Sequence, residues 1–210
     1  MAGPRMCTVR NVVAIAMCWT VASCSRPAPQ PALPPGATIV ALGDSLTYGT
    51  GATRDASYPT QLARRSGWNV VNAGVPGDTA AQGCARLQDL IDEHEPQLVL
   101  VLLGGNDFLR RASESAVAQG LKPCVDAARA SQVAMALIPV PRLGGNGLSY
   151  PPLYDEVARA ASMPLLDAGL DDLLATRSMR ADAVHLNAAG YEALAKRLTE
   201  RLAAHGWLAR

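Results

Sequence analysis

The chain is poor in aromatic residues, which make up 4% of its 210 residues and include one phenylalanine. Hydrophobic residues as a whole reach 49%, so aliphatic side chains and alanine must fill most of the core of a folded domain. Positive charge is not in excess either, since the formal net charge is +1 at pH 7. Nucleic-acid-binding proteins usually carry a basic stripe, so this balance gives no reason to expect a nucleic-acid partner.

The apolar run near the N-terminus is short. It occupies residues 12–22, follows Arg5 and Arg10, and ends at the sequence Val21-Ala22-Ser23-Cys24. As a helix it would be about 16 Å long, against about 30 Å for the hydrocarbon core of a bilayer. A basic start, a short apolar run and small residues before a cleavage point are typical of a signal peptide. We therefore expect export, with residues 1–23 as the signal peptide.

Cys24 adds a possible anchor, because Val-Ala-Ser-Cys resembles a bacterial lipoprotein box. The resemblance implies cleavage before Cys24 and a diacylglyceryl group on its thiol, which would hold the protein on a membrane of the cell envelope, facing the periplasm or the outer surface. The alternative is an ordinary secretory signal with an incidental cysteine, which would give a secreted protein. Residues 24–36 contain five prolines and predict an extended, semi-rigid tether.

Residues 37–210 show no repeat and no second linker, so they predict one domain. Apolar runs alternate in it with amphipathic segments. Strands are expected at 38–42, 68–72, 98–103, 133–138 and 164–166, and helices at 59–66, 79–94, 113–130 (kinked or split at Pro123), 154–161 and 188–204. This alternation predicts a parallel sheet covered by helices on both faces. Reactive groups in such sheets gather beyond the carboxyl ends of the strands.

Several enzyme motifs are missing. The chain has no P-loop and no G-x-G-x-x-G that opens a helix, so nucleotide binding is not expected. Ser45 lies in Gly-Asp-Ser-Leu-Thr rather than in the G-x-S-x-G turn of ordinary α/β-hydrolases. His94, His185 and His205 are too scattered for metal-ligand spacing, so we expect no metal and no cofactor.

Polar, glycine-rich motifs follow the predicted strands. Gly-Asp-Ser-Leu-Thr-Tyr-Gly occupies 43–49, Gly-Val-Pro-Gly-Asp-Thr 74–79, Gly-Gly-Asn-Asp 104–107, and Asp-Ala-Val-His stands at 182–185 before the last helix. Each motif alone is explained equally well as a turn or a helix cap. Their common place at strand ends indicates that they build one site.

These motifs resemble the blocks of the SGNH, or GDSL, hydrolases, and most closely those of the thioesterase I, lysophospholipase and arylesterase branch. The resemblance runs from about Thr38 to the end of the chain. It implies a three-layer α/β/α flavodoxin-like fold with a five-stranded parallel sheet. It also implies a serine esterase that hydrolyses carboxylic esters or thioesters through an acyl-enzyme intermediate.

The roles of three residues follow from chemistry as well as from the resemblance. A serine hydroxyl is a weak nucleophile unless a base takes its proton, so Ser45 needs a partner. His185 is the candidate base, because the pKa of imidazole lies near neutral pH. Asp182 would hold the imidazole in the tautomer that leaves its other nitrogen facing Ser45. We expect these side chains to form a catalytic triad.

The resemblance assigns the oxyanion hole to the backbone N–H groups of Ser45 and Gly77 and the side-chain amide of Asn106. Such donors must already be in place when the tetrahedral intermediate forms. Glycine at position 77 allows the backbone to approach the substrate closely. Asp44 and Asp107, beside these motifs, are interpreted as structural support rather than as chemistry.

Two other functions remain open. The same triad would suit a deacetylase of envelope polysaccharide, although its possible aromatic sugar platforms are few (Tyr48, Tyr150 and Tyr154). A lipoprotein that binds acyl chains without catalysis is the third possibility. Phe108 either floors an acyl or aryl pocket or packs against a helix, and the glycine-rich segment 141–150 is expected to be a mobile loop beside the cleft. The sequence predicts no oligomeric state.

Cys84 and Cys124 are the cysteines of the folded domain. In the order 2-1-3-4-5 their helices would be neighbours that run in the same direction. Cys84 lies early in one predicted helix and Cys124 late in the other, which argues against a disulfide unless Pro123 bends the second helix back.

Overall fold

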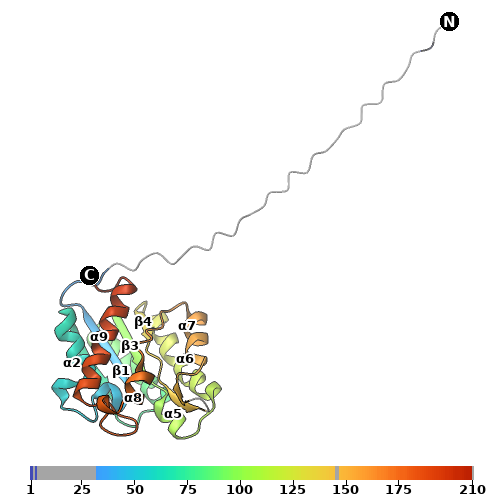
Figure 1. The fold of residues 1–210 in the computed structure, drawn as a ribbon. Coiled ribbons are helices and arrows are strands. Elements are labelled where there is room, and N and C mark those ends of the chain that lie inside the picture. Colours follow the sequence, from blue (N-terminus) through green and yellow to red (C-terminus); the bar gives the residue numbers. More distant parts are fainter. Residues whose placement is uncertain (2, 4–31, 145–146, 210) are drawn as a thin grey trace.

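The structure is a computed structural model that describes residues 1, 3, 32–144 and 147–209 (Figure 1). The predicted apolar run 12–22 and lipidation site Cys24 lie outside the described residues. Within the described ranges, no helix is both long and apolar enough to cross a membrane. Leu33, where the chain enters the domain, donates its backbone N–H to the carbonyl of Trp207 near the C-terminus, at 2.8 Å.

The centre of the domain is a parallel sheet with strand order β2-β1-β3-β4. Its strands are β1 (Thr38–Gly43), β2 (Asn69–Gly74), β3 (Leu98–Leu102) and β4 (Ala134–Leu137). Every residue of β3 is buried, as expected for an apolar run in the middle of a covered sheet.

The fifth predicted strand is reduced to one parallel bridge between Leu137 and Leu165, beside β4. The N–H of Leu137 donates to the Pro164 carbonyl at 3.1 Å, and the N–H of Leu166 donates to the Leu137 carbonyl at 2.7 Å. Proline has no N–H to extend such a ladder, which keeps the pairing short. The flavodoxin-like order 2-1-3-4-5 is therefore confirmed, with a minimal last strand.

Helices cover both faces of the sheet and confirm the three-layer fold (Figure 1). On one side α2 packs along α9, and α8 contacts α9; on the other, α6 contacts α3, α4 and α7. The helices are α1 (Ser45–Tyr48), α2 (Tyr58–Ser66), α3 (Ala80–Ala85), α4 (Leu87–His94), α5 (Gly105–Leu109), α6 (Glu114–Ala130), α7 (Leu153–Ala161), α8 (Leu170–Ala175) and α9 (Ala188–Ala204), with 3₁₀ turns η1 (Arg54–Ala56) and η2 (Arg177–Met179).

Some element predictions were wrong in detail. The helix expected at 79–94 is broken at Arg86 into α3 and α4, and Pro123 does not split α6. The segment 141–150, expected as a loop, contains the antiparallel strands β5 (Arg142–Gly144) and β6 (Gly147–Ser149), which flank residues outside the description. The short helices α1, α5 and α8 were not predicted, because fewer than two helical turns carry little periodic signal.

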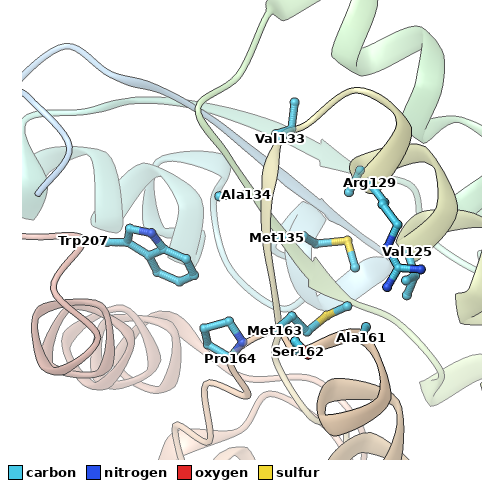
Figure 2. Close-up of a pocket in the computed structure, with 11 residues that line it drawn as sticks. Val125, Arg129, Val133, Ala134, Met135, Ala161, Ser162, Met163, Pro164 and Trp207 are labelled. Carbon is cyan, nitrogen blue, oxygen red and sulfur yellow. The ribbon is translucent and has the colours of Figure 1, made fainter. Parts of the chain in front are cut away.

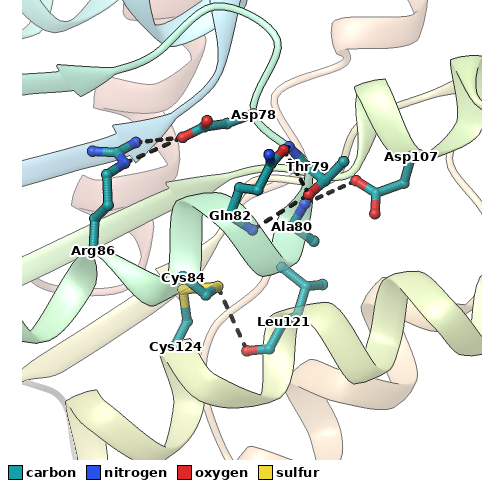
Figure 3. The surroundings of a disulfide bond; sticks show 9 residues. All are labelled: Asp78, Thr79, Ala80, Gln82, Cys84, Arg86, Asp107, Leu121 and Cys124. Atoms are coloured by element: carbon teal, nitrogen blue, oxygen red, sulfur yellow. Dashed lines mark hydrogen bonds and ion pairs between the residues drawn. A yellow bond between two sulfur atoms is a disulfide. The ribbon is translucent and has the colours of Figure 1, made fainter.

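Cys84 and Cys124 form a disulfide, with 4.8 Å between their Cα atoms, so the argument against it was wrong (Figure 3). The helices α3 and α6 run side by side in the same direction, since a Cβ on Gly120 would lie 3.0 Å from the Cβ of Ala80. Cys84 follows Ala80 by the same number of residues as Cys124 follows Gly120, so the two cysteines also lie side by side. The error lay in the register, because α6 begins about 9 Å before the point at which it reaches α3. A cross-link over 40 residues is expected to contribute about 2–4 kcal/mol.

The core is mainly aliphatic, as predicted, but it also contains three fully buried tyrosines. Each hydroxyl finds a polar partner, which a buried tyrosine requires. All of these bonds reach segments that follow the carboxyl ends of β1 or β3, and they therefore fix the loops at that edge. The pairs are Tyr58 with the Thr47 hydroxyl (3.1 Å), Tyr154 with the Leu103 carbonyl (2.8 Å) and Tyr191 with the Thr50 carbonyl (2.7 Å).

Candidate active site

Ser45 is the first residue of α1, directly beyond the carboxyl end of β1. Asp44 caps this short helix, since its Oδ1 accepts from the backbone N–H of Leu46 at 3.0 Å. Asp44 is buried, whereas Ser45 is half-buried. The strand-to-helix turn thus presents the Ser45 hydroxyl at the rim of the sheet while its neighbour fixes the turn from inside.

His185 and Asp182 share one tight turn before α9. Asp182 Oδ1 accepts from the backbone N–H groups of Val184 at 2.8 Å and His185 at 2.9 Å. Its Oδ2 lies 2.8 Å from His185 Nδ1, and His185 Nε2 lies 2.9 Å from Ser45 Oγ. The structure therefore brings together the three side chains that the sequence analysis assigned to a triad.

The loops that carry Ser45 and His185 meet at Gly51, a contact that the sequence analysis missed. Gly51 has φ +96°, and a Cβ there would lie 2.5 Å from the carbonyl oxygen of Leu186. Glycine satisfies both requirements, because it has no Cβ and adopts positive φ freely. The bond from Tyr191 to the Thr50 carbonyl holds the same junction. The available signal was the glycine spacing in Gly49-Thr50-Gly51.

The charge state of Asp182 decides how the trio can act. Desolvation alone would raise the pKa of this carboxyl, but hydrogen bonds from the His185 ring and from two backbone N–H groups outweigh it and hold the pKa below its usual value. An ionised carboxylate only accepts hydrogen bonds, so His185 Nδ1 must be the donor. Nε2 is then left to accept the proton of the Ser45 hydroxyl, as proton transfer from a nucleophile requires.

Gly77 lies in the loop between β2 and α3 and has φ +90°. A Cβ at position 77 would meet nothing within 4 Å, so lack of space does not require glycine there. The positive φ does, because glycine adopts it without steric strain. Among the described residues, the backbone N–H of Gly77 has no hydrogen-bond acceptor. It is therefore available to a ligand oxygen, as expected for an oxyanion donor.

Asn106, the second residue of α5, presents its amide at the same edge. Its Nδ2 lies 3.2 Å from Asp44 Oδ2 and 3.0 Å from the carbonyl oxygen of Asp78. These contacts join the serine turn to the Gly77 loop. Both amide protons thus have protein acceptors, so an oxyanion must share or displace one of these bonds to use Asn106.

Several side chains hold the Gly77 loop, and Figure 3 draws the contacts of its neighbours Asp78 and Ala80. Arg86 pairs with Asp78 at 2.8 Å, and Arg110 Nη2 donates to the Gly77 carbonyl at 3.0 Å. Buried Asp107 accepts from the N–H of Ala80 at 2.8 Å, at the start of α3. This contact agrees with the interpretation of Asp107 as support. The sequence analysis gave neither arginine a role, because their partners are set by tertiary contacts.

Asp44 gives a prediction on stability. Burial raises its pKa from 3.8 to about 6, although the N–H of Leu46 and the His185 charge oppose the shift. Between these values the folded protein holds a proton that the unfolded chain has lost, so the free energy of unfolding falls as pH rises through that window, by up to about 3 kcal/mol. Above it, this contribution is constant.

The Asp44→Asn variant should lack this part of the pH dependence. Urea unfolding of wild type and variant at pH 4, 5, 6 and 7 would measure it, using the change with pH rather than the absolute stability. Parallel curves for the two proteins would contradict the shift at Asp44.

Two cavities lie away from Ser45. One, of about 240 Å³, lies at the starts of β4 and of the last strand, where Val133, Pro164 and Trp207 contribute to its lining (Figure 2). The other, of about 540 Å³, is polar and lies between α8 and α9. In a parallel sheet the starts of the strands are the edge opposite to Ser45.

Phe108 is half-buried against the core, with the Arg142 guanidinium 5.8 Å from its ring centre.

A covered parallel sheet with a hydrogen-bonded Ser–His–Asp group at its carboxyl edge is the arrangement of a serine hydrolase. The sequence model of the GDSL-like Lipase/Acylhydrolase family matches residues 41–193, and the chain belongs to this family.

Curated relatives and solved structures agree with this membership. The chain is 34% identical over 158 residues to thioesterase 1/protease 1/lysophospholipase L1 of Escherichia coli (strain K12). The aligned residues cover 71% of this chain and 76% of that protein. It is 30% identical over 158 residues to the esterase TesA of Pseudomonas aeruginosa, with coverages of 70% and 79%. The crystal structure of TesA superposes with a TM-score of 0.70 at 27% identity, over 80% of this chain and 99% of that one.

Proposed function

We propose that this hydrolase cleaves carboxylic esters and thioesters through an acyl-enzyme intermediate on Ser45. The observation that carries the proposal is the chain of hydrogen bonds from Asp182 through His185 to Ser45, at 2.8 and 2.9 Å. The names of the relatives support the substrate range, since they include a thioesterase, a lysophospholipase and an arylesterase.

In the first half-reaction, Ser45 Oγ forms a bond to the substrate carbonyl carbon while its proton passes to His185 Nε2. Asp182 stabilises the resulting imidazolium. The carbonyl oxygen becomes an oxyanion that accepts hydrogen bonds from the Gly77 N–H, the Ser45 N–H and the Asn106 amide. The bond to the leaving oxygen or sulfur then breaks, and His185 returns the proton to it.

Water enters in the second half-reaction. His185 takes a proton from the water as its oxygen bonds to the acyl carbon. When the bond to Ser45 Oγ breaks, the same proton returns to Ser45, and the carboxylic acid leaves. No external oxidant, metal or cofactor is needed for these proton and bond changes.

A covalent probe tests the proposal. An alkyl fluorophosphonate should add one phosphonyl group to Ser45, because it places a tetrahedral centre where the substrate carbonyl would react. We expect the intact mass to increase by that group, with loss of esterase activity in parallel, and the Ser45→Ala variant to remain unlabelled. Labelling of another residue with the same loss of activity would overturn the assignment of the nucleophile.

We also propose that the protein is exported and held in the cell envelope through a lipid on Cys24. The supporting features are the short apolar run 12–22, the Val-Ala-Ser-Cys sequence and the proline-rich segment 24–36. The mass of the mature N-terminal peptide tests the proposal, since an unmodified Cys24 would contradict it.

A further inference from the structure

Gly77 is the third residue of a β-turn formed by residues 75–78, which we refer to as the Gly77 turn. The backbone N–H of Asp78 donates to the Val75 carbonyl at 3.2 Å and closes the turn. Pro76 is its second residue, and Gly77 has φ +90°. Proline in second place and a glycine of positive φ in third place are typical of a type II turn. Types I and II differ by roughly half a rotation of the middle peptide, and this peptide carries the Gly77 N–H. The turn therefore sets the direction of that oxyanion donor.

The middle peptide keeps its direction only while the ends of the turn stay in place. The Val75 N–H donates to the Gly43 carbonyl at 3.0 Å, which fixes the first end to β1. At the last end, Asp78 Oδ2 accepts from Arg86 Nη2 at 2.8 Å (Figure 3). The same nitrogen donates to the Ala73 carbonyl at 3.2 Å. Both ends of the turn are thus connected to the sheet, at β1 and β2.

Helix α5 carries the other side-chain donor of the oxyanion hole and is joined to the Gly77 turn by two side chains. Asn106 Nδ2 donates to the Asp78 carbonyl at 3.0 Å. Arg110, directly after α5, donates from Nη2 to the Gly77 carbonyl at 3.0 Å.

The two bonds from α5 differ in their fate during the reaction. Asn106 has to share its amide between the oxyanion and its present acceptors, so its hold on the turn is weakest when the tetrahedral intermediate forms. The bond from Arg110 reaches the carbonyl of Gly77 and uses no group of the oxyanion hole. It can therefore persist through both half-reactions and keep the turn against α5.

Building on the proposed function, we propose that Arg110 is a positioning residue, which holds the Gly77 turn against α5 so that the Gly77 N–H and the Asn106 amide reach the same oxyanion. Arg110 does not contact the substrate in this role, because it acts through the Gly77 carbonyl. Arginine suits it, since the guanidinium remains charged at every working pH and only donates hydrogen bonds. The guanidinium is exposed, so the loss of its bond is expected to have a moderate effect.

The test replaces Arg110 by methionine, which keeps an unbranched side chain and removes the donors and the charge. We expect kcat for a short-chain p-nitrophenyl ester to fall about five- to tenfold. KM should change little, because the oxyanion exists only after attack on the carbonyl. A trifluoromethyl ketone adds to Ser45 as a tetrahedral oxyanion, and its affinity should fall by the same factor as kcat. Arg110→Lys retains a charged donor for this single bond, and its kcat should return to within about twofold of wild type.

Arg111→Met is the matched control, since it removes the same charge from the neighbouring exposed position. Its kcat and its affinity for the ketone should equal those of wild type, and thermal unfolding checks the fold of each variant. Equal kcat in wild type and Arg110→Met, or an equal loss in Arg111→Met, would overturn the positioning role. A loss of kcat in Arg110→Met with unchanged affinity for the ketone would overturn it as well. Turnover that persists in Ser45→Ala would instead overturn the proposed function, so the two failures are distinguishable.

Discussion

Replacement of Ser45 by alanine is expected to lower kcat by about 10⁴- to 10⁶-fold, the range typical of a lost nucleophile in a serine hydrolase. The change removes Oγ, which lies 2.9 Å from His185 Nε2, and leaves the Asp182–His185 pair intact. Alanine fits the first position of α1, so the fold should persist. Turnover of a chromogenic ester by wild type and variant, each checked by thermal unfolding, measures the loss.

His185→Ala provides the internal control for that experiment. Because the serine and the histidine act as a unit, the double variant should be no slower than the slower single variant. Additive losses would show that His185 does not act through Ser45. Wild-type turnover in Ser45→Ala would refute the covalent route altogether.

Asn106→Ala should produce the next largest loss, about 10²- to 10³-fold in kcat, as expected when one oxyanion donor is removed. The effect belongs to the transition state, because the carbonyl oxygen gains its charge only during attack. KM should therefore change little. Steady-state kinetics with a short-chain ester would separate the two parameters.

The same variant also removes the bonds from Asn106 to Asp44 and Asp78, so structural damage must be distinguished from lost catalysis. A boronic acid, which forms a tetrahedral adduct on the serine, should bind more weakly by a factor comparable to the loss of kcat. Binding of the boronic acid at wild-type affinity, with slow turnover, would assign Asn106 a structural role and contradict the prediction.

The sequence predicted the parallel sheet well because its strands are marked by composition. Residues 98–103 are apolar throughout, and a strand buried on both faces has that pattern. The meeting of Ser45 with residues 182–185 could also be anticipated, since both motifs belong at the carboxyl edge and match one family. The topology, once known, leaves few other places for them.

Other features depended on distances that a sequence does not record. The disulfide required the offset between α3 and α6, in which Ala80 at the start of α3 lies beside Gly120 rather than beside the start of α6. Gly51 matters because another loop passes within 2.5 Å of its missing Cβ, and that loop is far away in sequence. Arg86 and Arg110 act on Asp78 and the Gly77 carbonyl through tertiary contacts alone.

The bond between Leu33 and Trp207 has a bearing on how the enzyme would be oriented in the cell. The chain enters the domain at the starts of the strands, while Ser45 stands beyond their ends, and β1 alone is about 20 Å long. With a lipid on Cys24, the tether would join the domain at the side opposite to Ser45, so the active site would face away from the membrane that carries the lipid. Such an enzyme would meet dissolved esters, or those on a facing surface, before it met the lipids under it.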